Sequence, residues 1–281
     1  MCLESPELMV RILKKVIPQT VRRIIGNFWI KKKRLTRPLA TFYERGNGHV
    51  LQCCISYNKY GGYCVPLSSL HRPAAQEILA GNVYEPETIE FMRASSPEGD
   101  IIHAGSFFGD FIPAISKSRK SDAKIWAFEP NLESFRCAEI TILINGLKNV
   151  KISNVGLGAE KSTQPMVIYD DHGRSLGGGS RLVDKTRNYH ENQLAEVEIT
   201  ALDTALPSDR QISIIQLDVE GFEQHALEGA LKTIRRCMPI LILENLPEED
   251  WLNKKIFNLG YKKTGQVHGN TIFVNNTNRD A

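Results

Sequence analysis

The most constraining feature of this sequence is an alternation of apolar runs and helix-like segments that begins at Asp100. Five short apolar runs are expected to be strands, and they cover residues 100–104, 124–128, 150–155, 213–219 and 239–244. Nearly continuous apolar runs are typical of strands buried on both faces of a parallel sheet. The C-terminal GYKKTGQVHGNTIFVN predicts an antiparallel hairpin that closes this sheet. The sequence therefore predicts an α/β fold.

Capping residues predict where the helices of this region begin. Asp110 is expected to cap the helix after the first strand, with Pro113 in its first turn, where a missing N–H is harmless. Asn131 is expected to open the helix after the second strand. One helix is expected over residues 222–236, between the fourth and fifth strands.

Composition and charge divide the chain into three parts. Residues 1–40 carry ten Lys or Arg and two acids, a charge of +8, so the remainder carries −5 of the net +3. We expect 1–40 to be a basic amphipathic arm, 41–98 a small accessory region with two strands and a helix, and 99–281 the main domain. The arm is interpreted as a solvated basic face. Contact with anionic lipid and binding of nucleic acid stay open as alternatives.

Composition also bears on location. No apolar run approaches the ~18 residues of a membrane span, and no signal peptide is evident. The six cysteines are irregularly spaced, which favours reduced thiols over a disulfide framework or a zinc site. We therefore expect a cytoplasmic protein, membrane-peripheral if the arm binds lipid. The oligomeric state has no sequence signal.

The turn after the first strand, Gly105–Gly109, limits which nucleotide this fold can hold. A dinucleotide fingerprint needs a glycine at the position of Phe107, so pyrophosphate is disfavoured, and no Walker loop is present. Glu129 ends the second strand, where a carboxylate accepts hydrogen bonds from a ribose diol. A ribose without phosphate suggests S-adenosylmethionine. The alternative is that Glu129 only caps the following helix.

Proteins with such parallel sheets bind their ligands beyond the carboxyl ends of the strands. The residues that directly follow the predicted strands are therefore the candidate site residues. The candidate cofactor-binding residues are His103, Gly105, Ser106, Phe107, Gly109, Glu129, Pro130, Asn154, Val155 and Gly156. The glycine-rich loop 173–180 has the flexibility expected of a lid, with a solvated hairpin tip as the alternative.

Three carboxylates, Asp218, Glu220 and Glu244, follow the fourth and fifth strands and are the candidate catalytic residues. Clustered carboxylates raise one another's pKa, which suits a general base for a hydroxyl acceptor. The alternative is a structural role in helix capping and loop order. Such a cluster also suits Mg²⁺ or Mn²⁺, but no metal is expected, because no water or histidine ligand can be placed from sequence.

Several segments, in this order and spacing, resemble an FkbM-type methyltransferase: IIHAGSFFGDF, IWAFEPNLESF, VEITALDTAL, SIIQLDVEGFEQHALEGA and ILILEN. The resemblance covers about residues 60–275. It implies a Rossmann-like class I fold with a largely parallel seven-stranded sheet, and O-methylation of sugars or polyketide hydroxyls. It further implies that Gly105, Ser106 and Glu129 contact the cofactor, and that Asp218 and Glu220 line the reaction cleft.

The sequence departs from the family's usual pattern at three positions. The family's first turn is usually D-x-G-A-N-x-G, but His103 replaces its acid and Phe107 its asparagine, and Gln216 stands where a lysine is frequent. We expect O-methylation of a hydroxyl on a small molecule, glycan or glycolipid, without specific nucleic acid. The alternatives are a catalytically weak binding module with the same fold and a dinucleotide oxidoreductase, which Phe107 argues against.

Overall fold

The computed structural model describes residues 50–95, 98–120, 122–184 and 186–275. The predicted basic arm lies outside these residues, and the described residues belong to one compact unit. The boundary expected near residue 98 stays a prediction. No helix in the described part of the chain is long and apolar enough to cross a membrane.

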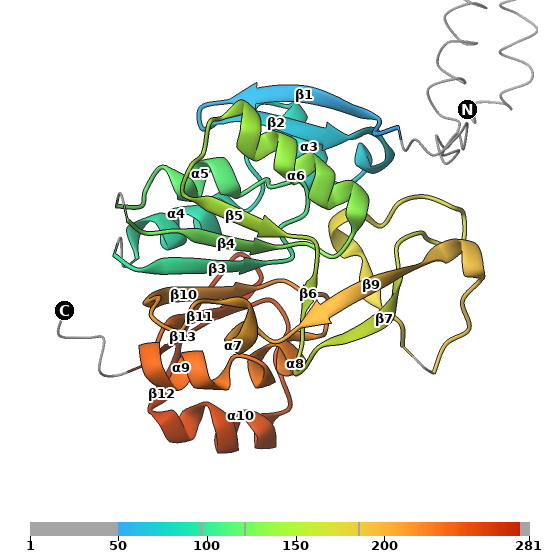
Figure 1. The fold of residues 1–281 in the computed structure, drawn as a ribbon. Coiled ribbons are helices and arrows are strands. Elements are labelled where there is room, and N and C mark those ends of the chain that lie inside the picture. The colour runs from blue at the N-terminus through green and yellow to red at the C-terminus, as the bar shows by residue number, and fades with distance from the viewer. Residues whose placement is uncertain (1–49, 96–97, 121, 185, 276–281) are drawn as a thin grey trace, which may run out of the picture. The chain divides into compact units, whose positions relative to one another are not determined.

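A seven-stranded sheet forms the centre of this unit (Figure 1). Its order is β12-β13-β11-β10-β3-β4-β5, and only β13 runs antiparallel to the other strands. Its strands are β3 (Asp100–Ala104), β4 (Ile125–Phe128), β5 (Val150–Ser153), β10 (Ile212–Leu217), β11 (Ile240–Leu243), β12 (Tyr261–Val267) and β13 (Asn270–Asn275). The predicted α/β fold, its seven strands and its closing hairpin are confirmed.

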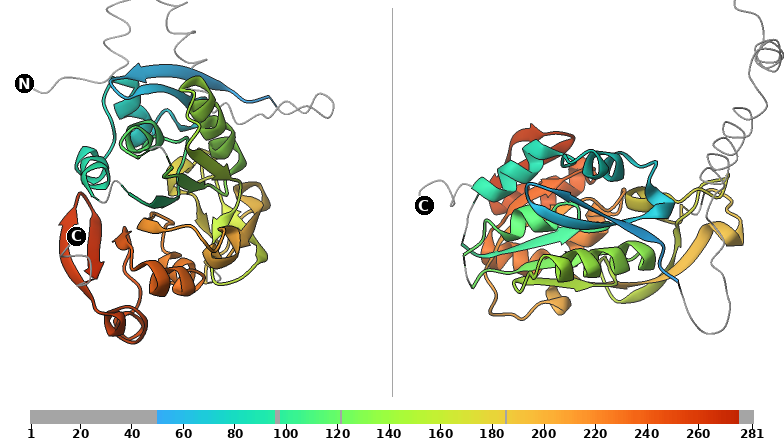
Figure 2. Two further views of the ribbon diagram at one scale, coloured as in Figure 1. Left: turned by 60° about the vertical axis from the view of Figure 1, so that its left-hand side comes forward. Right: turned by 90° about the horizontal axis from the view of Figure 1, so that it is seen from above.

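Helices cover both faces of this sheet, as Figure 2 shows from two further sides. One face packs on α4 (Pro86–Ala94) and α5 (Ile112–Ser116) through an isoleucine-rich core. The other face packs on the helices α8 (Glu223–Glu228), α9 (Leu231–Cys237) and α10 (Glu249–Lys255). The short α7 (Leu202–Ala205) also lies on this second face, because its Leu202 is part of the same core. Burial on both faces explains why β3, β4 and β11 are apolar along almost their whole length.

Two smaller sheets flank the central one. The accessory region forms the predicted hairpin of β1 (Cys53–Asn58) and β2 (Gly61–Pro66), followed by α3 (Pro73–Leu79). Residues 156–200 form a four-stranded sheet with the order β6-β9-β7-β8. Its strands are β6 (Gly156–Leu157), β7 (Ser162–Val167), β8 (Arg181–Leu182) and β9 (Leu194–Thr200). Between β7 and β9 the chain also forms the short 3₁₀ helices η2 (Gly177–Gly179) and η3 (Glu191–Gln193), while η1 (Leu67–Ser69) and η4 (Phe257–Leu259) lie elsewhere.

Two predicted helix features are wrong and one is confirmed. Helix α5 starts at Ile112 with Phe111 at its N-cap, and Asp110 is buried instead of capping it. The helix expected over residues 222–236 is split into α8 and α9 at Gly229, where a Cβ would lie 2.0 Å from the carbonyl oxygen of Gly158. Asn131 does cap α6 (Leu132–Ile144), since its side chain accepts from two backbone N–H groups.

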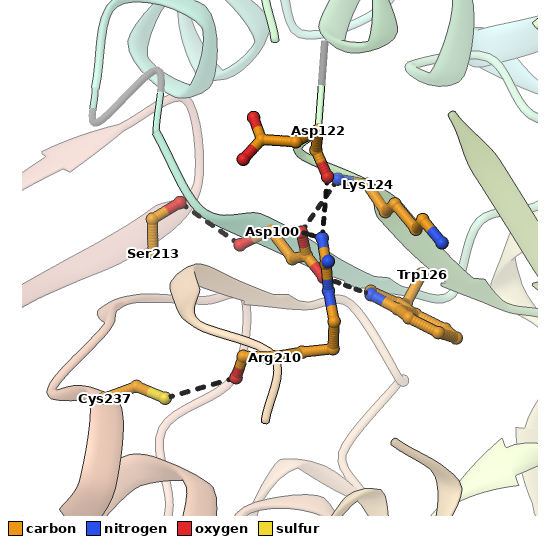
Figure 3. A network of polar contacts seen from close by, with 7 residues as sticks. All are labelled: Asp100, Asp122, Lys124, Trp126, Arg210, Ser213 and Cys237. Atoms are coloured by element: carbon orange, nitrogen blue, oxygen red, sulfur yellow. Dashed lines mark hydrogen bonds and ion pairs between the residues drawn. The ribbon is translucent and has the colours of Figure 1, made fainter. Parts of the chain in front are cut away.

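A buried polar network ties the start of β3 to its neighbours (Figure 3). The carboxylate of Asp100 is fully buried and accepts hydrogen bonds from the Lys124 backbone N–H, from Trp126 Nε1 and from Arg210. Arg210 also donates to the backbone carbonyl of Asp122. This network fixes the amino-terminal edge of the sheet, opposite the edge that carries the candidate site.

Candidate active site

A cavity enclosing about 510 Å³ opens at the carboxyl edge of the central sheet. One wall comes from the ends of β3 and β4 and from the chain after β10. The opposite wall comes from the four-stranded sheet, with Met166, Leu182 and Ile199 facing the cavity. The cavity therefore lies where parallel sheets bind nucleotides.

The turn after β3 passes very close to the chain after β10. Gly105 has a positive φ of 81°, and a Cβ there would lie 1.7 Å from the carbonyl oxygen of Asp218. Phe107 also has a positive φ, 46°, which is uncommon for a residue with a side chain. Phe107 does not line the cavity just described, and its ring packs on the glycines of η2, with its Cζ 2.8 Å from a Cβ built at Gly177. Phe107 therefore does not fill the nucleotide cavity.

Glu129 lines this cavity, and it also holds the surrounding backbone. One carboxylate oxygen accepts from the Phe107 N–H at 2.8 Å and the other from the Asn131 N–H at 2.9 Å. Burial raises the pKa of Glu129 to about 8, and nearby Asp110 contributes. Each oxygen keeps a lone pair for a ribose hydroxyl. The ribose-binding role and the backbone-holding role are therefore compatible.

The predicted cofactor residues divide into three groups. Gly105, Glu129, Pro130 and Gly156 line the nucleotide cavity. His103 and Phe107 line a second cavity instead. The remaining four do not line the first cavity, and they are Ser106, Gly109, Asn154 and Val155.

Three residues of this last group hold the turns after β3 and β4 through hydrogen bonds to the backbone. The Asn154 side chain donates to the carbonyl oxygens of Glu129 and Pro130, at 2.8 and 3.0 Å. The Ser106 hydroxyl and backbone N–H both point to the carbonyl oxygen of Phe128. Gly109, with a φ of 81°, donates its N–H to the Ser106 carbonyl. These residues position the backbone that forms the cavity wall.

Sequence reasoning missed the residues of the four-stranded sheet and of the turn after β10. The cavity residues not predicted are Ala104, Phe128, Leu157, Met166, Leu182, Ile199, Val219 and Phe222. Gly177, Gly178 and Ser180 also line the cavity, and they belong to the glycine-rich loop 173–180 that the sequence indicated as a candidate lid. Met166, Leu182 and Ile199 carry no motif, and their side chains reach the cavity only because the small sheet packs there.

A second cavity of about 660 Å³ adjoins the first. The two share Gly105, Gly178 and Asp218 as lining residues. Five carboxylates line the second cavity, from Glu85, Asp110, Asp218, Glu220 and Glu244. Arg72 is the one arginine or lysine among the described residues that line it. This cavity is therefore strongly acidic, and it touches the nucleotide cavity along a common wall.

The three predicted catalytic carboxylates do come together in this second cavity. One oxygen each from Asp218, Glu220 and Glu244 lies within 4.8 Å of the others. Burial, together with the nearby carboxyl groups of Glu244 and Glu220, raises the pKa of Asp218 well above its ordinary value. Burial also raises the pKa of Glu220, against the opposing charges of Arg72 and Arg181. Glu220 caps no helix, because the N-cap of α8 is Phe222.

His103 and Gln216 form a buried pair in neighbouring strands beside these acids. His103 Nδ1 donates to Gln216 Oε1 at 2.5 Å, and its ring stacks on Phe111 with centroids 5.3 Å apart. Burial lowers the pKa of His103 to about 4, so the ring is neutral. Two of the three family departures, His103 and Gln216, are thus partners of each other.

Comparison with known proteins identifies the family. The model of the methyltransferase FkbM domain matches residues 103–263, more than half of the chain. The chain therefore belongs to the FkbM methyltransferase domain family, and its sheet is that of a Rossmann-like class I methyltransferase. The family and the fold support S-adenosylmethionine as cofactor. A search of curated proteins found no match.

Solved structures that resemble this one are distant. An FkbM methyltransferase from Methylobacillus flagellatus KT is 14% identical over 63% of this chain and 44% of its own, with a TM-score of 0.43. A methyltransferase from Geobacter sulfurreducens is 11% identical over 68% and 79%, with a TM-score of 0.41. A putative O-methyltransferase from Klebsiella pneumoniae is 12% identical over 68% and 81%, with a TM-score of 0.37. The chain spans less than half of the Methylobacillus protein.

Replacement of Glu129 tests the ribose site. At pH 9, above the pKa of about 8, Glu129 is ionised, and Glu129→Ala should weaken binding of S-adenosylhomocysteine by roughly 10- to 150-fold, because about 1.5–3 kcal/mol is lost with hydrogen bonds to a charged group. Calorimetric titration measures this change. Glu160→Gln, at an exposed acid of the β6–β7 connection, is the control and should bind like the unmodified protein. Equal affinity in all three proteins would remove Glu129 from the site.

The raised pKa of Glu129 predicts a pH-dependent affinity for the nucleoside. The ionised carboxylate accepts two hydroxyl hydrogen bonds, and below a pKa of about 8 its ionised fraction falls tenfold per pH unit. Affinity for adenosine should therefore rise from pH 6 to about 8 and then level off. Adenosine is the suitable probe because it carries the ribose diol without an amino acid. Glu129→Gln should abolish this dependence, and a flat profile in the unmodified protein would contradict the assignment.

Proposed function

We propose that this protein transfers a methyl group from S-adenosylmethionine to a hydroxyl of a glycan, glycolipid or related metabolite. The observation that carries the proposal is the common wall of the two cavities, formed by Gly105, Gly178 and Asp218. A nucleoside bound against Glu129 would direct its sulfonium toward this wall. An acceptor in the acidic cavity would then meet the methyl carbon beside Asp218.

The chemistry requires alignment and a base. The acceptor oxygen attacks the methyl carbon in line with the carbon–sulfur bond, which breaks and returns its electron pair to sulfur. The hydroxyl proton passes to a carboxylate of the Asp218, Glu220 and Glu244 cluster. Burial and the neighbouring acids raise the pKa of Asp218, which makes its carboxylate a stronger proton acceptor than a free one. Asp218 is favoured as this base because it lines both cavities.

The surroundings of the acidic cavity support a polar, extended acceptor. A third cavity of about 1040 Å³ shares Pro73, Tyr84 and Glu85 with it. Asn58, Glu77 and Asn82 also line this third cavity, and the hydrogen-bonding capacity that they do not use on one another can serve hydroxyls. Tyr84 adds an aromatic face against which a sugar ring can pack. A glycan fits this lining better than a purely apolar metabolite.

Methyl transfer from S-adenosylmethionine labelled in its methyl group tests the proposal. We expect label to enter hydroxyl-bearing sugars or glycolipids, in a linkage stable to mild base, as an ether is. Matched acceptors whose reactive hydroxyl is replaced by hydrogen should remain unlabelled. Transfer to amines or carboxylates, with none to hydroxyls, would replace this proposal by another acceptor class.

A further inference from the structure

Three carboxylates in the acidic cavity come close to the geometry of an ion site. Ligand oxygens of Asp218, Glu220 and Glu244 all lie within 4.8 Å of one another. Mg²⁺ binds oxygen at about 2.0–2.1 Å, so its opposite ligands lie up to about 4.2 Å apart, and side-chain shifts of a few tenths of an ångström would bring these oxygens into that range. Asp218 and Glu244 directly follow the neighbouring strands β10 and β11. Glu220 lies two residues after Asp218, in a turn where its own φ is positive at 54°.

A second and independent observation points to a ligand at the same place. His103 is 2% exposed and lines the acidic cavity, and its Nε2 has no hydrogen-bond partner within the described structure. Its Nδ1 is occupied by Gln216, so the free lone pair is on Nε2. An unpaired buried nitrogen costs stability unless something binds it.

Strand register places His103 on the same face of the sheet as Asp218 and Glu244. His103, Gln216 and Ile242 are paired across β3, β10 and β11, so their side chains share one face of the sheet. Side chains alternate between faces, so the row two residues further, with Asp218 and Glu244, continues on that same face. The rows are about 6–7 Å apart along the strands. That spacing suits a water molecule on the ion that donates to Nε2.

The charge of the cavity also favours a cation. Five carboxylates line it, and Arg72 is the one arginine or lysine among the described residues that line it. A divalent ion bound among Asp218, Glu220 and Glu244 would offset the repulsion between carboxylates held this close together.

We propose that Asp218, Glu220 and Glu244 bind a divalent cation of the Mg²⁺ or Mn²⁺ class, with His103 Nε2 accepting a hydrogen bond from a water on that ion. Carboxylate and water oxygens are the ligands these ions prefer. The sequence alone did not predict a metal, because nothing in it places His103 beside the acids. The role of the ion rests on the proposed function: it would bind the acceptor oxygen and make its proton easier to remove.

Direct measurement of Mn²⁺ binding tests the site without substrate. The full chain, freed of metal by a chelator that is then removed, is titrated with Mn²⁺ while electron paramagnetic resonance reports the free ion. We expect saturable binding of one ion per chain. Asp218→Asn and Glu244→Gln should each weaken it by at least about 10- to 100-fold. Glu160→Gln, an exposed acid outside the cavity, should leave it unchanged.

Two further readouts keep the outcomes distinct. S-adenosylhomocysteine binding, measured separately, shows whether each variant is folded and whether the proposed function holds. Mn²⁺ should raise the unfolding temperature of the unmodified protein, because a ligand that binds only the folded state stabilises it, and should not raise that of Glu244→Gln. No saturable Mn²⁺ binding, or binding equally tight in the cofactor-competent Asp218→Asn and Glu244→Gln proteins, would overturn the proposal.

Discussion

Asp218→Asn is expected to lower the turnover number for methyl transfer by about 10²–10⁴-fold, the usual contribution of a positioned acid or base. The carboxamide keeps the size of the side chain but cannot accept the acceptor's proton, and it is a poorer ligand for a cation. The Asp218 carbonyl oxygen, which lies against Gly105, is unaffected by the change. Affinity for S-adenosylhomocysteine should therefore stay within about fivefold, since the Glu129 contacts remain.

Single-turnover kinetics on the hydroxyl acceptor, together with cofactor titration, separate these two effects. Asp209→Asn is the matched control, because Asp209 is exposed and precedes β10 at the opposite edge of the sheet. It should react at the unmodified rate. A fully active Asp218→Asn protein would show that the acidic cavity is not where the acceptor reacts.

Asp100→Ala is expected to destabilise the folded chain by about 3 kcal/mol, because removal of one partner of a buried ion pair leaves the groups bonded to it without a partner. Trp126 Nε1 and the Lys124 N–H lose their acceptor inside the protein. Arg210 is 27% exposed and regains part of its interaction from water, which keeps the loss at the lower end of the range for such pairs.

The unfolding temperature of Asp100→Ala should fall by roughly 6–12 °C, at about 2–4 °C per kcal/mol for a domain of this size. Scanning calorimetry or circular dichroism measures it. Glu139→Ala, which removes a surface ion pair with Arg136, is the control and should leave the transition nearly unchanged. An equally small shift for Asp100→Ala would mean that the network of Figure 3 contributes little to stability.

The sequence predicted the parts of the fold that follow from burial on both faces of a sheet. The apolar runs became β3, β4, β5, β10 and β11 within a few residues, and the side chain of Asn131 caps α6 as expected. The helix over 222–236 was predicted whole because nothing local shows that Gly229 approaches Gly158. Asp110 was assigned to a cap, but it is buried beside the acidic cavity.

The candidate site was predictable where it follows from strand ends. Asp218, Glu220 and Glu244 converge because parallel strands end at the same edge. Arg72, Tyr84 and Glu85 were missed, since the accessory region reaches the site only through tertiary packing. The hydrogen bond between His103 and Gln216 depends on strand register, which the sequence does not reveal for two residues 113 positions apart.

The most direct test of the central claim is calorimetric titration of the full chain with S-adenosylmethionine and S-adenosylhomocysteine, with and without Mn²⁺. We predict one binding site per chain with low-micromolar affinity of the order of −8 kcal/mol, mutual competition between the two ligands, and loss of affinity in Glu129→Ala. Absence of binding by folded protein in every condition would contradict the account, because the cavity between β3, β4 and the four-stranded sheet would then not be a cofactor site.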